Sequence, residues 1–222
     1  MNREQLKDQI KSISSDVRRL GEVLNTMWEN ESLCFDETYE AKSVRMARRA
    51  EWIALRLREL VYVSTNVRKW DYLPRAAEAM GIKIEEREGI YEITLPGLMP
   101  KRKSRKGTAY LIEPLYAALE KFVGEHRIVR HAHYTVCFVL VYDRALSERR
   151  VRDYDNLELK EVLDAAAAYL MVSDSGLLCD AYQTTELGEA DCTQVFVMDT
   201  ERYPEWYAGR KAAAREAINP SR

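Results

Sequence analysis

Residues 149–160 read RRVRDYDNLELK and join two strongly patterned segments of the chain. The segment before them, residues 134–142, is almost continuously apolar and rich in β-branched side chains, which predicts a central strand buried on both faces. The segment after them repeats apolar residues at helical spacing, which predicts a helix over about residues 156–171. Two aspartates, Asp153 and Asp155, therefore stand where a strand is followed by a helix.

The aspartates of this stretch favour metal chemistry. In extended backbone, side chains two residues apart point the same way, so Asp153 and Asp155 can face one spot. Two carboxylates about 4 Å apart repel by roughly 4 kcal/mol at an effective dielectric of about 20. A third acid, Asp174 beyond the predicted helix, adds to that cost. Hard cations such as Mg²⁺ or Mn²⁺ neutralise such a group, and beside basic side chains they are typical of phosphodiester cleavage.

A structural role explains the same acids. Asp155 followed by Glu158 matches a capping box at a helix start. Asp153 could be a solvated loop acid, and the sequence Ser173-Asp174-Ser175-Gly176 has ordinary turn composition. Spacing alone leaves both interpretations open.

The order of these features resembles the RusA-type Holliday junction resolvases, which are small, dimeric, Mg²⁺-dependent endonucleases. The resemblance rests on RDYDNL at 152–157, a lysine shortly after it, a helix, and Ser-Asp at the far end of that helix. Upstream, YEITLPG at 91–97 followed by Pro100 is similar to the family's opening strand and its proline-bearing loop. Three further segments correspond to its first helix, central strand and last strand: 111–122, 134–142 and 193–198. The resemblance covers roughly residues 90–200.

This resemblance implies roles for four side chains. The family's three essential acids fall on Asp153, Asp155 and Asp174, which would bind Mg²⁺, with Mn²⁺ as a substitute. The family's catalytic lysine comes four residues after the second acid, where this chain has Leu159. Lys160 follows, turned by about 100° around a helix. The implied catalytic set is therefore the three acids with a displaced Lys160.

The length of the predicted helix bears on how the acids could meet. A helix over residues 156–171 would be roughly 24 Å long. Asp155 and Asp174, at its two ends, would then lie too far apart to share an ion. Either the helix is interrupted, or Asp174 comes from a second subunit. We hypothesise a twofold homodimer in which this helix pairs antiparallel with its mate and each site combines acids of both chains.

Local basic runs predict where DNA would bind. The net charge of −2 and a pI near 6.0 do not favour nucleic-acid binding by the chain as a whole. Branched or duplex DNA would therefore contact local patches, although a solvated loop remains the alternative for the first of them. The predicted DNA-binding residues are Lys101, Arg102, Lys103, Arg105, Lys106, Arg149, Arg150 and Arg152.

Composition sets the broad class. A chain of 222 residues with 46% hydrophobic and 32% charged residues is typical of a soluble globular protein of one or two domains. No apolar run is long enough to span a bilayer and no signal-like region begins the chain, so we expect a cytoplasmic protein without a membrane partner. The four cysteines are scattered, which predicts reduced thiols. His131 and His133 could be metal ligands, but surface histidines are the favoured interpretation.

The predicted fold class is α+β, with a mixed β-sheet of four or five strands, packed helices and an N-terminal α-helical hairpin. An apolar seam with alternating spacings of four and three runs through residues 1–30: Leu6, Ile10, Ile13, Val17, Leu20, Leu24 and Met27. It predicts a helix that packs either on its own neighbour or in an intermolecular coiled coil. The predicted domains are the helical hairpin region (1–80), a RusA-like endonuclease domain (81–204), and a C-terminal helix and tail (205–222).

Two functions follow from these expectations. The first is a metal-dependent, structure-selective endonuclease that cleaves phosphodiesters in branched DNA. The alternative is a catalytically degenerate RusA-like protein, such as one from a mobile element, that binds DNA or serves assembly. The displaced Lys160 and the acidic pI favour the alternative.

Overall fold

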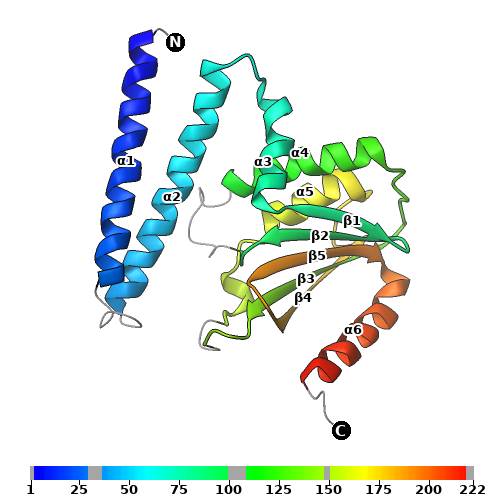
Figure 1. Ribbon diagram of the computed structural model, residues 1–222. Coiled ribbons are helices and arrows are strands. Elements are labelled where there is room, and N and C mark those ends of the chain that lie inside the picture. Colours follow the sequence, from blue (N-terminus) through cyan, green and yellow to red (C-terminus); the bar gives the residue numbers. More distant parts are fainter. Residues whose placement is uncertain (1–2, 30–36, 100–108, 148–150, 219–222) are drawn as a thin grey trace. The chain divides into compact units, whose positions relative to one another are not determined.

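The computed structural model describes residues 3–29, 37–99, 109–147 and 151–218. It divides into two compact units, Met1–Tyr72 and Leu73–Arg222, which are taken separately below. The boundary lies inside a helix, whereas the sequence placed it at residue 80. Figure 1 labels the helices and strands. No helix in the described ranges is long and apolar enough to cross a membrane.

The first unit is built on two long helices, α1 (Arg3–Glu29) and α2 (Glu37–Ser64), which lie side by side and antiparallel (Figure 1). The predicted helical hairpin is thus confirmed. Asp16 joins the helices, because its carboxylate accepts hydrogen bonds from Arg49 at 2.9 Å and Arg56 at 2.7 Å. The hydrogen bond from Arg49 is the main cause that lowers the pKa of Asp16, and the positive charges of Arg49 and Arg56 add to this effect.

Helix α3 (Lys69–Met80) begins upstream of the proline that it contains. Proline commonly opens a helix because the first turn needs no N–H from it, yet Pro74 lies inside α3. The first turn forms upstream, where the N–H of Tyr72 donates to the carbonyl of Arg68 at 3.2 Å. The helix ends at Met80, and Gly81 with a φ of 81° takes the left-handed position that commonly follows a helix.

The second unit contains a five-stranded mixed sheet in the order β1-β2-β5-β3-β4, which confirms the predicted α+β class. The strands are β1 (Lys83–Arg87), β2 (Ile90–Pro96), β3 (Tyr134–Asp143), β4 (Cys179–Gly188) and β5 (Cys192–Asp199). Only β3 and β4 pair in parallel. The β1–β2 hairpin turns at Glu88 and Gly89, both with positive φ, as a type I′ turn requires.

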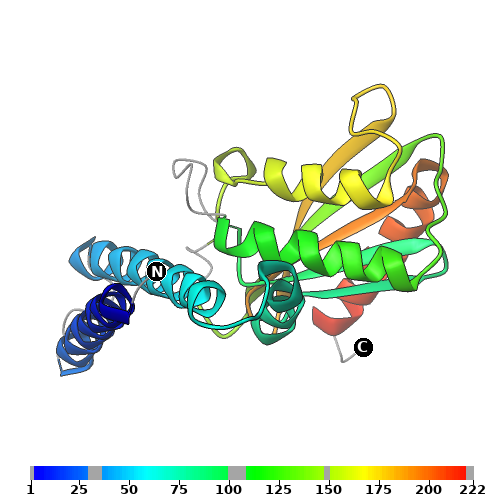
Figure 2. The same cartoon turned by 90° about the horizontal axis from the view of Figure 1, so that it is seen from above.

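Helices cover both faces of this sheet. Helices α4 (Ala109–Glu125) and α5 (Lys160–Leu170) lie on one face, and α6 (Tyr203–Ile218) lies on the other (Figure 2). Leu115, Val136 and Val162 belong to the larger core cluster under α4 and α5. Under α6 a smaller cluster contains Cys137 and Phe196. Strand β3 is buried along both faces, as its apolar sequence predicted.

Candidate functional site

The acidic stretch follows β3 and is fixed to the sheet by side chains on either side of Asp153. The backbone N–H of Arg152 donates to the hydroxyl of Tyr142 at 3.0 Å, and the hydroxyl of Tyr154 hydrogen-bonds Thr185 of β4 at 2.9 Å. A single turn of 3₁₀ helix, η3 (Tyr154–Asn156), begins at the second of these anchors. The chain therefore presents its acids on a turn held against the parallel strands.

Within this turn the two acids are exposed, but they do not share an extended backbone. Asp153 precedes η3 with extended φ and ψ and makes no capping hydrogen bond with its side chain, whereas Asp155 lies within η3. Tyr154, which lies between the two acids, is the first residue of η3, so the backbone from Asp153 to Asp155 is not extended throughout. The expectation that both side chains point the same way because the backbone is extended is therefore wrong.

The helix after the stretch begins later than predicted, at Lys160 instead of Asn156. Leu157 and Leu159 are 5% and 8% exposed, and both contribute to the core under α5. Both leucines are buried while Glu158 between them is half-buried, so this segment has the alternation of an extended chain. A helix does not bury residues that are two apart on the same face. Helix α5 consequently has 11 residues and is roughly 16 Å long. Its N-cap is Leu159, so the capping-box explanation of Asp155 is also wrong.

Lys160 is the first residue of α5 and is exposed. Its ammonium group hydrogen-bonds the carboxylate of Asp164 one turn further along the helix. That hydrogen bond and the charge of Asp164 raise the pKa of Lys160, and the charges of Asp174 and Glu158 add to the effect. Lys160 therefore stays protonated at neutral pH and lies within electrostatic reach of one predicted metal ligand.

Asp174 lines an open pocket of about 340 Å³ beside the last turns of α5. The wall residues are Asp164, Ala167, Ala168, Val172, Ser173 and Asp174. The two alanines leave room along the helix, so carboxyl groups from the helix and from the following loop share one hollow. The sequence analysis missed Asp164. Its spacing of four from Lys160 is the signal that could have identified it, because such residues face each other on a helix.

Asp174 lies toward the opposite end of the parallel strand pair from Asp153 and Asp155. It precedes β4, whose first residue, Cys179, pairs with Tyr134 at the start of β3. The other two acids follow the end of β3. Across the described residues, no three histidine, cysteine or acidic side chains are grouped so as to hold a metal ion. One chain by itself thus leaves the predicted trio apart.

Of the predicted DNA-binding residues, Arg152 alone lies within the described ranges; Lys101, Arg102, Lys103, Arg105, Lys106, Arg149 and Arg150 lie outside them. The guanidinium of Arg152 donates to the carbonyl of Met99 at 3.2 Å. Met99 lies two residues before Lys101, where the first basic run begins, and Arg152 lies two residues after Arg150 of the second. This hydrogen bond therefore brings together the points at which the two runs join the described chain.

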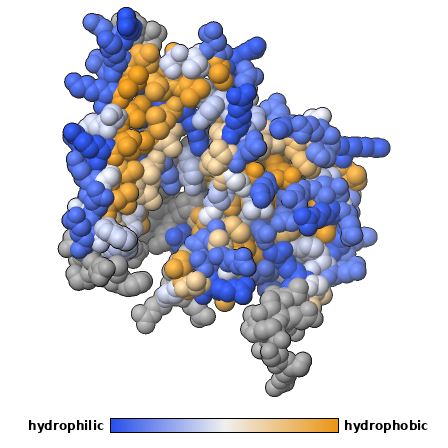
Figure 3. Space-filling view, viewed as in Figure 1, coloured by the Kyte–Doolittle hydropathy of each residue, from blue (hydrophilic) through white to orange (hydrophobic). Residues whose placement is uncertain are grey.

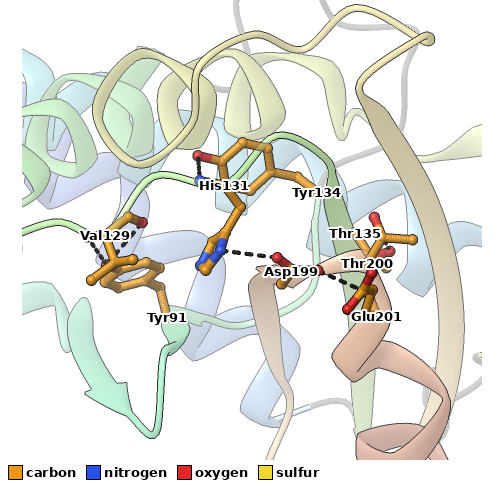
Figure 4. Close-up of polar contacts among 8 residues, drawn as sticks. All are labelled: Tyr91, Val129, His131, Tyr134, Thr135, Asp199, Thr200 and Glu201. Atoms are coloured by element: carbon orange, nitrogen blue, oxygen red, sulfur yellow. Dashed lines mark hydrogen bonds and ion pairs between the residues drawn. The ribbon is translucent and has the colours of Figure 1, made fainter.

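His131 lies just before the start of β3 (Figure 4). The Nδ1 of His131 is 2.9 Å from a carboxylate oxygen of Asp199, and its backbone N–H donates to the hydroxyl of Tyr134 at 2.8 Å. The backbone N–H of Val129 donates to the hydroxyl of Tyr91 at 2.9 Å. His131 is half-buried and bonds both Asp199 and Tyr134, which holds this loop on the sheet, whereas His133 is exposed.

Fold and site together define an α+β protein with an acidic pocket along one helix of its sheet unit. The chain belongs to a family that is described as a family of unknown function (DUF6100), whose model matches residues 2–220. The match spans both units, so the helical pair is part of the family's architecture. A search of curated proteins found no match. The resemblance to RusA-type resolvases stays a prediction.

Proposed function

We propose that this protein is a Mg²⁺-dependent endonuclease that cleaves branched DNA as a twofold homodimer with shared sites. The separation of the acids along α5 carries the proposal: Asp153 and Asp155 precede its first turn, and Asp174 follows its last. Pairing α5 antiparallel with its copy about a twofold axis would bring the first turn of one helix beside the last turn of the other. Each of two sites would then receive acids from both chains.

The donor atoms suit the proposed ion. Asp153, Asp155 and Asp174 are exposed, and all offer carboxylate oxygen, the ligand that Mg²⁺ and Mn²⁺ prefer. Asp153 and Asp174 make no hydrogen bond or ion pair with another described residue, which leaves their oxygens available. When bound, Mg²⁺ would activate water and stabilise negative charge on the phosphate.

Lys160 and Asp164 complete the proposed site. Asp164 adds a carboxylate to the pocket that contains Asp174 and keeps the ammonium of Lys160 at the start of α5. A protonated lysine in this place would stabilise the charge that develops on a phosphate oxygen during cleavage. Lys160 therefore takes the role of phosphate stabiliser in the proposal, and Asp164 the role of its positioning residue.

The bond between Arg152 and Met99 supports DNA binding beside these acids. It ties Met99, two residues before the first basic run in the sequence, to Arg152, which immediately precedes Asp153. Phosphate contacts from both runs would orient the backbone of branched DNA at the acidic turn, without requiring a basic protein as a whole.

Mixing two inactive variants tests the proposal. Asp153→Asn and Asp174→Asn should each abolish nicking of a four-way DNA junction in Mg²⁺ or Mn²⁺. Mixed in equal amounts after dissociation and reassociation, they should recover about one quarter of the wild-type sites, because half of the dimers are mixed and each mixed dimer holds one intact site. Glu120→Gln, an exposed change on α4, is the matched control and should cleave normally.

Two results would contradict the shared-site nuclease. Unchanged cleavage by Asp153→Asn would remove the acid from catalysis. Inactive single variants that recover nothing on mixing would place each site within one chain.

A second function has its own supporting observation. The described residues of one chain hold no preformed three-ligand metal group, and Lys160 is paired with Asp164. These features favour a degenerate RusA-like protein that binds DNA or serves assembly. Binding of a four-way junction, with equal affinity in the presence and absence of Mg²⁺ and no cleavage, would support this alternative.

A further inference from the structure

The two edges of the sheet differ in how well they are protected from pairing with a further strand. An edge strand presents unpaired N–H and C=O groups, and shortness or charge commonly blocks them. At one edge, β1 has five residues, all charged except Ile84. At the other, β4 has ten residues, contains no proline and pairs with β3 without interruption along its whole length. Strand β4 is therefore the long, regular edge of this sheet.

The most open stretch of β4 is Asp180–Gln183, in which four consecutive side chains are exposed. Along a strand, the backbone groups of successive residues point to opposite sides. The carbonyl of Leu178 accepts a hydrogen bond from Tyr134 at 2.8 Å, so the even-numbered residues turn their backbone groups toward β3. The N–H and C=O groups of Ala181 and Gln183 consequently point to the open edge.

The surface around this edge does not suggest an apolar contact. Figure 3 shows mostly hydrophilic residues over the sheet unit, with apolar side chains scattered among them. Backbone hydrogen bonds would therefore hold a partner at β4, and an added antiparallel strand would supply them.

The charges of β4 suit pairing with a copy of itself. The strand carries two charged residues, Asp180 and Glu186. With a twofold axis at Tyr182, neither would face a charge, and Asp180 would face Thr184 of the partner subunit. Because Lys211 donates to Thr184 at 3.0 Å, each Asp180 would lie near a lysine of the other chain. Centring the pair one residue later would set Asp180 opposite Glu186 of the partner subunit, and like charges directly opposite destabilise a sheet.

The same register joins the two halves of the proposed acidic site. Tyr154 holds the acidic turn to Thr185, three residues after Tyr182. Cys179 comes three residues before Tyr182. Burial is the main cause that raises the pKa of Cys179, and the charge of Asp174 contributes, so Asp174 lies near this end of the strand. Since Thr185 would face Cys179 of the partner subunit, the acidic turn of one chain would lie beside Asp174 of the partner subunit.

The spacing of the helices agrees with this arrangement. Helix α4 lies toward β1, and α5 lies on the β4 side of it (Figure 2). Neighbouring strands are about 4.8 Å apart, so a helix above β3 and β4 would lie about 10 Å from its copy across the new pair. Packed helices are separated by roughly 8–10 Å. Ala167 and Ala168, which line the pocket beside α5, would permit this approach.

We propose that the open edge of β4 pairs antiparallel with the same edge of a second copy, with Tyr182 on the twofold axis, so that one sheet runs through both chains. Ala181 would exchange backbone hydrogen bonds with Gln183 of the partner subunit on each side of the axis. The choice of a second copy as the partner rests on the proposed function, because this pairing supplies the shared site with its two chains.

Disulfide trapping tests the register. Tyr182→Cys should cross-link to itself on oxidation, because the Cα atoms of a non-hydrogen-bonded antiparallel pair lie about 4.5 Å apart. Asp180→Cys, an exposed change on the same face of β4, is the matched control. It should not cross-link beyond the wild-type background, since its two copies would be about 14 Å apart. Self-linking of Asp180→Cys, or no cross-link in Tyr182→Cys, would overturn the proposal.

Gln183→Pro tests the backbone pairing. The proline removes an N–H that points to the open edge and leaves the hydrogen bonds to β3, a position at which edge strands tolerate proline. Self-association in sedimentation equilibrium should weaken by roughly 30-fold, because each dimer loses two hydrogen bonds. Gln183→Ala keeps the N–H and should associate as the wild type does. A monomeric wild type at micromolar concentration, or equal association of the two variants, would overturn the proposal; the disulfide test stands if the proline variant fails to fold.

The pairing and the nuclease can fail separately. A cross-linked Tyr182→Cys dimer, with no junction cleavage by the wild type, would keep the pairing and remove the proposed function. Recovery of cleavage on mixing Asp153→Asn with Asp174→Asn, without a cross-link in Tyr182→Cys, would keep the shared site and remove the pairing at β4.

Discussion

Arg152 donates a 3.2 Å hydrogen bond from its guanidinium to the carbonyl oxygen of Met99, and so connects two segments that are distant in the sequence. This contact bears on how the protein would hold DNA, because each residue adjoins one of the basic runs.

Arg152→Ala should therefore weaken DNA binding by releasing the two runs from each other. If Arg152 only positions the runs, the affinity falls while the slope of log affinity against log salt is kept. If Arg152 also binds a phosphate of duplex DNA, the slope decreases by about 0.9. Fluorescence anisotropy over a range of salt concentrations measures both quantities. Arg130→Ala, an exposed arginine before β3, should bind as the wild type does; an unaltered affinity in Arg152→Ala would contradict the prediction.

Asp164→Asn should lower the pKa of Lys160 toward its ordinary value of 10.5, because the main cause of the upward shift is removed. The raised pKa contributes stability that is present below pH 10.5 and is lost as the pH rises through the folded value. Lys160 is fully solvated, so the melting temperature at neutral pH should barely change. NMR titration of the lysine side chain measures the shift. As a control, Glu120→Gln should leave the pKa of Lys160 unchanged. If Asp164→Asn also left the pKa of Lys160 unchanged, the pairing of Lys160 with Asp164 would be refuted.

Gly188→Ala should destabilise the sheet unit. Gly188 ends β4, and a Cβ there would lie 2.5 Å from the Cγ1 of Val141 on the neighbouring strand. Since valine is stiff, the strand must shift, at a cost of about 1–3 kcal/mol. Urea unfolding measures the difference in free energy. Gly176→Ala provides the control, because nothing lies within 4 Å of a Cβ at that position. Equal stability of the two variants would show that Gly188 is not needed for close packing.

The protein should lose stability at alkaline pH because the thiol of Cys137 is buried. Burial raises the pKa of its thiol from 9.0 to about 11, so the unfolded thiol loses its proton first as the pH rises. Stability is therefore complete below pH 9 and falls by roughly 2–3 kcal/mol as the pH approaches 11. Tyr203, whose pKa burial raises to about 12, adds to the same trend.

Comparison with Cys137→Ala isolates the thiol, since the variant should lose less stability than the wild type between pH 9 and 11. Cys192→Ala removes a half-buried thiol and should change the pH dependence less. Parallel pH curves for wild type and Cys137→Ala would contradict the assignment.

Much of the fold could be predicted because the spacing of apolar residues within a short segment shows which side chains that segment buries. The apolar run of β3 predicted a strand buried on both faces, and the heptad spacing of α1 predicted its helix. The predicted start of α5 was wrong because Leu157 packs in a core formed by residues that are distant in the sequence.

The candidate site was less predictable than the fold. Asp174 and Asp164 share a pocket because the chain turns back along α5, which no spacing of acids reveals. In the proposed nuclease, Asp153 would meet Asp174 only across two chains. Symmetry between subunits leaves no local pattern in one sequence, so the proposed dimer must be tested by mixing variants.

The core position of Leu159 constrains where a lysine can stand in the proposed nuclease, in which Lys160 comes one place later than in the resolvase pattern. Moving it back would put an ammonium group where a side chain is 8% exposed. Deleting one residue before it would turn Leu157 outward, since the facing of side chains alternates along such a segment. The packing of Leu157 and Leu159 in the core therefore fixes the number of residues between Asp155 and Lys160. In the proposed nuclease, the acids could shift relative to the lysine only through the exposed turn that carries Asp153 and Asp155.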